Sequence, residues 1–210
     1  MIVILNYDMG NVGSIQNMLK KIGEKGVVIS RDEDIVAKAD KMILPGVGSF
    51  DMGMVKLNEY GLMDLIRAHA DSGKALLGIC LGMQLLGRRS EEGQLEGLGL
   101  IPFECRRFNF STLDTSDESQ NLKVPHMGWD RAHIRQRTPL TENLDDKQRY
   151  YFVHSYYVVC DSTSNILMTC EYGNEFPAAV CGSNVYGVQF HPEKSHAFGM
   201  KLLDNFAHRC

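Results

Sequence analysis

Residues 75–86 read Ala75-Leu76-Leu77-Gly78-Ile79-Cys80-Leu81-Gly82-Met83-Gln84-Leu85-Leu86, and this stretch decides the fold. An apolar run leads into a cysteine flanked by glycine-bearing turns, and a helix-like segment follows. This is the pattern of a nucleophile elbow, with Cys80 where hydrolases carry serine. Glycines suit such a turn because the backbone passes too close for a Cβ atom, and a helix N-terminus favours a thiolate. If Cys80 stood alone, a buried structural cysteine would be the favoured interpretation.

Strand and helix signals alternate around this stretch in the first half of the chain. Helical spacing or composition predicts helices over 12–22, 32–39 and 57–70, the last interrupted near Gly61. Apolar runs predict strands over 2–7, 27–29, 41–44 and 75–79. Such alternation implies βαβ crossovers and a parallel sheet.

The second half reads differently, because short strand-like segments follow one another with polar or glycine-bearing turns between them. They cover 122–124, 129–134, 150–159, 166–171, 178–181 and 185–190, and a final helix is predicted over 195–208. We therefore expect an α/β fold with a mostly parallel central sheet, helices on both faces and an added antiparallel portion. Residues 1–210 are predicted to form a single domain, with the polar stretch 111–121 as a surface loop.

Composition excludes several classes of function. The 210 residues carry a formal net charge of −4 and no long basic stretch, which argues against a general nucleic-acid binder. No apolar run is long enough to span a membrane, and residues 2–5 read as a core strand, not a signal peptide. The six cysteines form no C-x-x-C pair, so neither a metal site nor any cofactor is expected. We expect reduced thiols and a cytoplasmic protein.

A second motif, Gly187-Val188-Gln189-Phe190-His191-Pro192-Glu193-Lys194-Ser195, places an imidazole beside a carboxylate. Pro192 favours an extended conformation for His191, and residues two apart in an extended segment point to the same side. Glu193 can then hold one tautomer of His191 and stabilise its charged form. Cys80, His191 and Glu193 thus follow the chain order nucleophile, base and orienting acid. A strand-ending histidine with a solvated glutamate is the alternative.

A third motif, Pro45-Gly46-Val47-Gly48-Ser49-Phe50, follows the strand predicted over 41–44. It lacks the lysine and the glycine spacing of nucleotide-binding loops. A glycine loop in this place can direct a backbone N–H at an anionic intermediate, together with the N–H of Leu81. An ordinary turn between a strand and a helix is the alternative.

Together these motifs resemble the class I glutamine amidotransferases of the triad type, whose fold is flavodoxin-like. Within that class, the chain resembles the glutaminase subunits of imidazole glycerol phosphate synthase from Gly10 to the final helix. The more particular motifs are Pro125-His126-Met127-Gly128-Trp129 and Tyr151-Phe152-Val153-His154-Ser155-Tyr156.

The resemblance implies that Cys80 attacks the side-chain amide of L-glutamine and forms a thioester, which water then hydrolyses. His191 would transfer the protons, Glu193 would orient His191, and the N–H groups of Val47 and Leu81 would form the oxyanion hole. The resemblance also implies a set of substrate-binding residues: Gly46, Gly48, Gln84, Glu92, Tyr151, His154 and Ser155.

The resemblance further implies a partner, a (β/α)₈ cyclase subunit that forms a heterodimer with this chain and receives the ammonia. The acceptor would be a ribonucleotide intermediate of histidine biosynthesis. Four residues match positions near that interface: Asn11, Met127, Trp129 and Lys194. Little glutaminase activity is then expected of the isolated chain.

Three other interpretations stay open at this point. Asp130 stands where the family usually has asparagine, and 103–121 is longer and more polar than expected, so a related subunit that supplies ammonia for a surface-polysaccharide sugar is one alternative. A cysteine hydrolase of the same fold is another, although such enzymes lack the His-Pro-Glu pairing. A non-catalytic docking subunit is the third, and the presence of all three triad residues argues against it.

Overall fold

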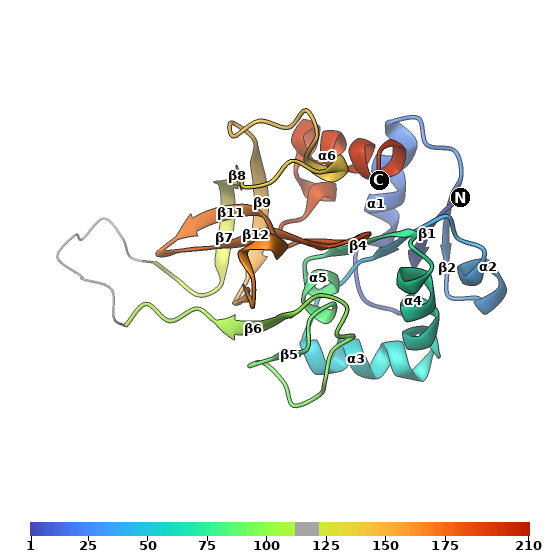
Figure 1. The fold of residues 1–210 in the computed structure, drawn as a ribbon, viewed down its shortest axis with the longest axis horizontal. Coiled ribbons are helices and arrows are strands. Elements are labelled where there is room, and N and C mark those ends of the chain that lie inside the picture. Colours follow the sequence, from blue (N-terminus) through green and yellow to red (C-terminus); the bar gives the residue numbers. More distant parts are fainter. Residues whose placement is uncertain (112–121) are drawn as a thin grey trace.

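A computed structural model describes residues 1–111 and 122–210, and an eight-stranded sheet lies at its centre (Figure 1). The strand order is β2-β1-β3-β4-β13-β12-β11-β8. The first part of this order, 2-1-3-4 followed by one more parallel strand, is that of flavodoxin-like sheets, which bind ligands beyond the carboxyl ends of their strands. Its parallel strands are β2 (Val27–Ser30), β1 (Ile2–Leu5), β3 (Lys41–Leu44), β4 (Ala75–Ile79) and β13 (Val185–Val188).

Antiparallel strands extend this sheet and build two smaller ones. The extension consists of β12 (Asn174–Gly182), β11 (Ile166–Tyr172) and β8 (His133–Ile134). The three-stranded sheet has the order β10 (Tyr156–Cys160), β6 (Phe103–Arg107) and β5 (Arg89–Ser90). The two-stranded sheet pairs β7 (His126–Arg131) with β9 (Arg149–His154). The predicted fold class is confirmed.

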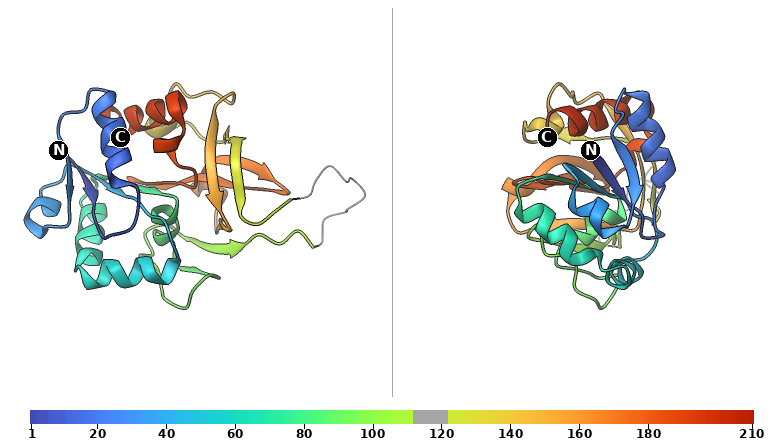
Figure 2. Two further views of the ribbon diagram at one scale, coloured as in Figure 1. Left: turned by 180° about the vertical axis from the view of Figure 1, so that it is seen from behind. Right: turned by 90° about the vertical axis from the view of Figure 1, so that its right-hand side faces the viewer.

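Helices cover both faces of the parallel strands (Figures 1 and 2). On one face lie α1 (Val12–Lys21) and α6 (His196–His208), and on the other α3 (Phe50–Glu59), α4 (Leu62–Asp71) and α5 (Leu81–Leu85). The short α2 (Glu33–Ala37) lies beside β1 and α4. Alternate residues of β1 serve the two cores, since Ile2 and Ile4 join one apolar cluster while Val3 and Leu5 join the other.

The helix predicted over 57–70 is two helices, and the break near Gly61 is confirmed. α3 ends at Glu59 and α4 begins at Leu62, with Gly61 in the left-handed region at φ 64°. The start of α3 at Phe50 was not predicted, because Gly53 weakens the helical signal. A Cβ atom at Gly53 would lie 3.0 Å from a methyl group of Leu85, so tertiary packing against α5 explains this glycine.

Three strand predictions are corrected by the structure. Residues 122–124 form no strand, and β7 begins at His126, three residues before the predicted 129. The segment predicted over 150–159 is interrupted at Ser155, where the chain passes from β9 to β10. Apolar runs cannot reveal such interruptions, because each strand here pairs within a different sheet. Short 3₁₀ turns complete the described elements: η1 (Pro139–Thr141), η2 (Thr163–Asn165) and η3 (Pro192–Lys194).

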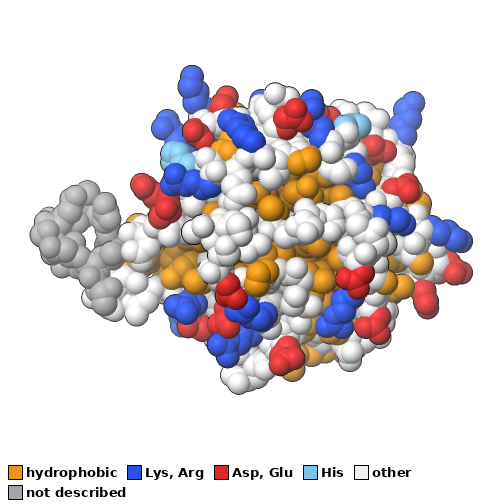
Figure 3. All heavy atoms as spheres, in the orientation of Figure 1, with side chains coloured by type: hydrophobic (Ala, Val, Ile, Leu, Met, Phe, Trp, Pro, Cys, Tyr) orange, Lys and Arg blue, Asp and Glu red, His pale blue; other side chains and the backbone are white. Residues whose placement is uncertain are grey.

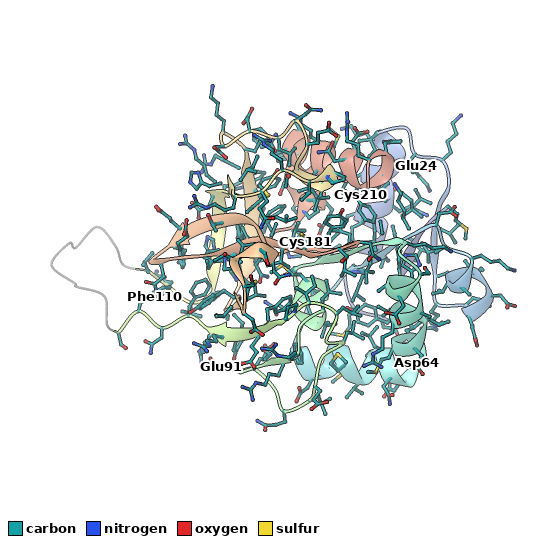
Figure 4. The ribbon with its side chains drawn as sticks, in the orientation of Figure 1. Glu24, Asp64, Glu91, Phe110, Cys181 and Cys210 are labelled. Atoms are coloured by element: carbon teal, nitrogen blue, oxygen red, sulfur yellow. The ribbon has the colours of Figure 1, made fainter. Side chains whose placement is uncertain are left out.

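The surface carries charges of both signs (Figure 3), and the cysteines are distributed between the core and its margins. On the face in Figure 3, basic and acidic side chains are interspersed over the described residues. No helix in the described part of the chain is long and apolar enough to cross a membrane. All six cysteines are free, and Figure 4 shows Cys181 on the sheet and Cys210 beyond α6. Cys170 is buried in the core, whereas Cys160 and Cys181 are half-buried. Nearly all of the predicted 111–121 loop lies outside the described residues.

Candidate active site

Cys80 lies in a tight elbow between β4 and α5. Its backbone has φ 54° and ψ −109°, a conformation that costs a non-glycine residue about 1–3 kcal/mol. Both neighbouring glycines are required by close packing. A Cβ at Gly78 would lie 2.7 Å from the Gly82 carbonyl oxygen, and a Cβ at Gly82 would lie 1.9 Å from the Leu44 carbonyl oxygen. The predicted reason for these glycines is thus confirmed.

His191 and Glu193 are in contact, with Nδ1 of His191 2.8 Å from Oε1 of Glu193. Both side chains are buried, and Nδ2 of Asn11 also donates to Oε1 of Glu193 at 3.2 Å. The prediction of the contact is right, but its extended geometry is wrong beyond His191. Pro192 begins the η3 turn, a position that its fixed φ favours, and this turn carries Glu193 back toward the imidazole.

The charges around His191 favour its protonated form. Burial alone would lower the pKa of His191, but the Cys80 sulfur and the Glu193 carboxylate outweigh burial and raise that pKa to about 9. Burial opposes the charged form of Glu193, yet His191 and Asn11 hold the pKa of Glu193 below its usual value. Nε2 of His191 is buried and makes no hydrogen bond within the described residues. No other described group therefore competes for Nε2.

A cavity of about 300 Å³ opens at the Cys80 elbow. Four parts of the chain line this cavity: the Cys80 elbow, His191, the glycine loop after β3 and the segment around the β9–β10 junction. The predicted residues that line it are Val47, Gly48, Cys80, Leu81, Gln84, Glu92, His154, Ser155 and His191. Pro125, Val153 and Tyr156 complete the lining. Segments far apart in the sequence therefore meet at the carboxyl ends of β3 and β4.

Gln84 and Glu92 present acceptors to this cavity. Nε2 of Gln84 donates to the Tyr156 carbonyl oxygen at 3.1 Å and to Oε1 of Gln189 at 3.0 Å, so both amide hydrogens are used. Its carbonyl oxygen is then the group left for a ligand. Oε2 of Glu92 accepts from the Phe50 N–H at 2.8 Å, which holds the carboxylate at the start of α3.

Two predicted substrate-binding residues, Gly46 and Tyr151, do not line the cavity. Gly46 packs under the elbow, where a Cβ would lie 2.7 Å from the Gly82 nitrogen. Tyr151 instead supports the triad, since its carbonyl oxygen accepts from the His191 N–H at 2.9 Å. The Tyr151 ring contacts Trp129 and lies 5.6 Å from Nζ of Lys194.

His154 forms a wall of the cavity and has both ring nitrogens occupied. Nδ1 lies 2.8 Å from the Tyr156 carbonyl oxygen, which can only accept, so Nδ1 carries the hydrogen. Burial lowers the pKa of His154 to about 3, so its Nε2 is an acceptor and receives a hydrogen from Nδ1 of His126 at 3.1 Å. Nε2 of His126 lies 2.7 Å from the Asp130 carboxylate.

Sequence reasoning missed three polar residues of this region: His126, Asp130 and Gln189. The Gly187–Ser195 motif contained Gln189, but its position two residues before His191 gave no sign of the partners it meets. His126 and Asp130 are four residues apart on β7, and the pairing of β7 with β9 brings His126 into contact with His154, which lines the cavity. Pairing across strands was the missing information.

The four predicted interface residues occupy one region around β7 and η3. Met127 is 62% exposed, whereas Trp129 is half-buried, and its ring stacks on that of His196 with the ring centroids 5.4 Å apart. Lys194 belongs to η3, and Asn11 precedes α1 while contacting Glu193. Among the described residues, no group of three or more His, Cys, Asp or Glu side chains is placed to hold a metal ion.

Comparison with known proteins agrees with this fold. The family described as "Glutamine amidotransferase class-I" matches residues 3–210. A solved structure titled "Crystal structure of glutamine amidotransferase" matches with a TM-score of 0.73 and 18% identity, covering 99% of this chain and 100% of that one. A second solved structure, "Structure of PurLQS from Thermotoga maritima", matches with a TM-score of 0.71 and 21% identity, covering 98% of this chain and 96% of that one. The chain belongs to the class-I glutamine amidotransferases.

Within this family the chain is similar over its full length to subunits of one enzyme. "Imidazole glycerol phosphate synthase subunit HisH 2" of Methanococcus maripaludis is 53% identical, with 98% of each chain covered. The protein of the same name from Pseudomonas aeruginosa is 45% identical, also with 98% of each covered. "Imidazole glycerol phosphate synthase subunit HisH" of Sulfurimonas denitrificans is 48% identical, with 98% and 97% covered. The predicted resemblance is confirmed.

Proposed function

We propose that this chain is the glutaminase subunit of an imidazole glycerol phosphate synthase, which releases ammonia from L-glutamine for histidine biosynthesis. The observation that carries the proposal is the buried contact between His191 and Glu193 beside the strained Cys80 elbow, at a cavity large enough for an amino acid. The full-length similarity to HisH subunits supports it. Both predicted alternatives without glutaminase chemistry, the cysteine hydrolase and the docking subunit, fit the family poorly.

The reaction begins when the Cys80 thiol gives its proton to Nε2 of His191 and the resulting thiolate attacks the amide carbon of glutamine. A tetrahedral intermediate forms, and the N–H groups of Leu81 and Val47 stabilise its oxyanion, each donor contributing about 3–4 kcal/mol. His191 then gives its Nε2 proton to the departing nitrogen, so the C–N bond breaks, ammonia leaves and a thioester remains. Water, deprotonated by His191, attacks the thioester and releases glutamate.

Glutamine is held at the opposite end of the cavity by the acceptors found there. The carbonyl oxygen of Gln84 and the carboxylate of Glu92 suit the α-ammonium group of the substrate. Both ring nitrogens of the neutral His154 are occupied, so this ring forms a rigid wall, and the hydrogen bonds to glutamine come from neighbouring residues. Ser155 and Gly48 line the remaining side.

A (β/α)₈ cyclase subunit is the proposed partner in a heterodimer, docking on Met127, Trp129, Lys194 and Asn11. The contacts of β7 support a coupling of this surface to the triad. Met127 pairs with Val153 across β7 and β9, and the Val153 carbonyl oxygen accepts from the Cys80 thiol at 3.9 Å. Trp129 pairs with Tyr151, whose carbonyl oxygen holds His191. A shift of β7 on docking would therefore reach both reacting groups.

Glutamine hydrolysis should be slow in the isolated chain and rise about 10- to 100-fold when the cyclase subunit is added, a typical size for coupling between sites. Glutamate release measured with and without the cyclase checks this. Met127→Glu, at the exposed interface residue, should weaken the stimulation, whereas Ile35→Glu on the distant α2 should not. Full activity without the partner would contradict the proposed coupling.

The identity of the acceptor is tested in the same complex. Synthesis of imidazole glycerol phosphate from the ribonucleotide intermediate would support the histidine pathway. Stimulation only by a sugar-modifying synthase would instead support the surface-polysaccharide alternative. We further propose that residues 1–210 work as a single cytoplasmic domain with reduced thiols, which the free state of all six cysteines supports.

A further inference from the structure

Gln189 lies directly below the reacting sulfur and is completely buried, with 0% of its surface exposed. It follows the end of β13, and its backbone N–H donates to the Ala178 carbonyl oxygen at 2.9 Å, so its position is fixed by the sheet. Its amide nitrogen Nε2 lies 3.8 Å from Sγ of Cys80, within the range of a hydrogen bond to sulfur. Burial and the backbone hydrogen bond fix the position of this side chain, so only the direction of its amide group, oxygen or nitrogen toward the sulfur, remains to be determined.

That orientation is determined by a chain of hydrogen bonds that begins at the Tyr156 carbonyl oxygen. A carbonyl can only accept, so the group of Gln84 that meets it is the NH₂ group. The same NH₂ group of Gln84 lies 3.0 Å from Gln189, which must therefore present its oxygen. The NH₂ group of Gln189 is left facing the sulfur. The direction of the amide follows from its partners and requires no assumption about Cys80.

We propose that Gln189 is a catalytic residue that donates an amide hydrogen to the Cys80 sulfur and stabilises it as a thiolate before glutamine is attacked. A hydrogen bond to an ionised acceptor is roughly twice as strong as one between neutral groups, and burial strengthens it further. No proton is transferred from the amide, which keeps both hydrogens throughout. Because β13 and β4 are parallel neighbours, Gln189 reaches the sulfur from the adjacent strand end, and its donor adds to the positive charge of the His191 imidazolium. The inference rests on the proposed role of Cys80 as nucleophile.

Alkylation of Cys80 by iodoacetamide at neutral pH tests this donor without glutamine. The Cys80 peptide is followed by mass spectrometry in the wild type and in Gln189→Met, which keeps the length of the side chain but removes the donor. We expect alkylation of Cys80 to slow about tenfold, the effect of losing one hydrogen bond to a charged group. The control is Gln148→Met, which removes another buried glutamine that is hydrogen-bonded to Tyr150 outside the cavity. In this variant Cys80 should be alkylated at the wild-type rate. Equal rates in Gln189→Met and the wild type would overturn the proposal.

A second variant keeps the proposal testable if Gln189→Met packs poorly. Gln189→Glu preserves the acceptor for Gln84 and the volume, but places an acceptor oxygen against the sulfur, so alkylation should be slower still. In the complex, both variants should lower kcat about tenfold with the KM for glutamine changed less than about threefold. Wild-type alkylation in Gln189→Glu would also overturn the inference. Failure of the nucleophile assignment itself would appear separately, as glutamine turnover that survives in Cys80→Ala.

Discussion

Glutamine-dependent synthesis should be lost from the complex when Cys80 is replaced by alanine. The sulfur is the only atom at the elbow placed to bond to the amide carbon, so no thioester can form in Cys80→Ala. We expect glutamine turnover to fall by more than about 10³-fold. Synthesis from added ammonium salts should continue at the wild-type rate, because the cyclase performs that step. Both rates are measured on the same preparation of the complex.

Cys160→Ala is the matched control for this variant. Cys160 is a half-buried thiol at the end of β10 and does not line the cavity, so both rates should stay unchanged. Loss of the ammonia-driven rate in Cys80→Ala would indicate damage to the complex. Glutamine-driven synthesis that persists in Cys80→Ala would contradict the assignment of the nucleophile.

His191→Asn should lower kcat for glutamine about 10²- to 10⁴-fold, because the leaving nitrogen and the attacking water lose their proton donor and acceptor. The other histidine that lines the cavity, His154, has both ring nitrogens occupied and cannot replace His191. His133→Asn, on the edge strand β8, is the control and should retain wild-type kcat. A kcat within about threefold of the wild type in His191→Asn would contradict the proposed acid–base role.

The same substitution should change how stability depends on pH. The pKa of His191 is raised from 6.5 to about 9 in the folded chain, so its charged form stabilises folding fully below pH 6.5. This contribution is lost as the pH rises from 6.5 toward 9. The difference in melting temperature between the wild type and His191→Asn should therefore shrink over that interval. A difference that stays constant or grows would contradict the charged pairing of His191.

The sequence predicted the elements of the site better than their mutual geometry. Gly78 and Gly82 predicted a close approach of backbone segments, and a Cβ atom at either position would collide with backbone atoms. The contact of His191 with Glu193 was predicted for the wrong reason, since the η3 turn produces it. Spacing along one segment can predict that two side chains meet, but it does not identify the local turn.

Partners that meet only through the fold could not be predicted. Gln189 faces Cys80 because β13 and β4 are parallel neighbours, and Gln84 orients it from α5. His126 reaches His154 because β7 pairs with β9 in this register. Tyr151 belongs to a motif typical of a binding region, yet its carbonyl oxygen accepts a hydrogen bond from the His191 N–H and its ring lies beside Trp129. Strand register and hydrogen-bond direction are properties of the folded chain, and a single sequence does not encode them in any short pattern.

Mass spectrometry of the working complex tests the central claim most directly. The wild-type chain with its cyclase partner is supplied with excess glutamine, quenched in acid during turnover and digested. We expect a glutamyl group on the peptide that contains Cys80, removable by hydroxylamine as a thioester should be. A glutamyl group on another cysteine, or none on Cys80 while glutamate continues to form, would contradict it.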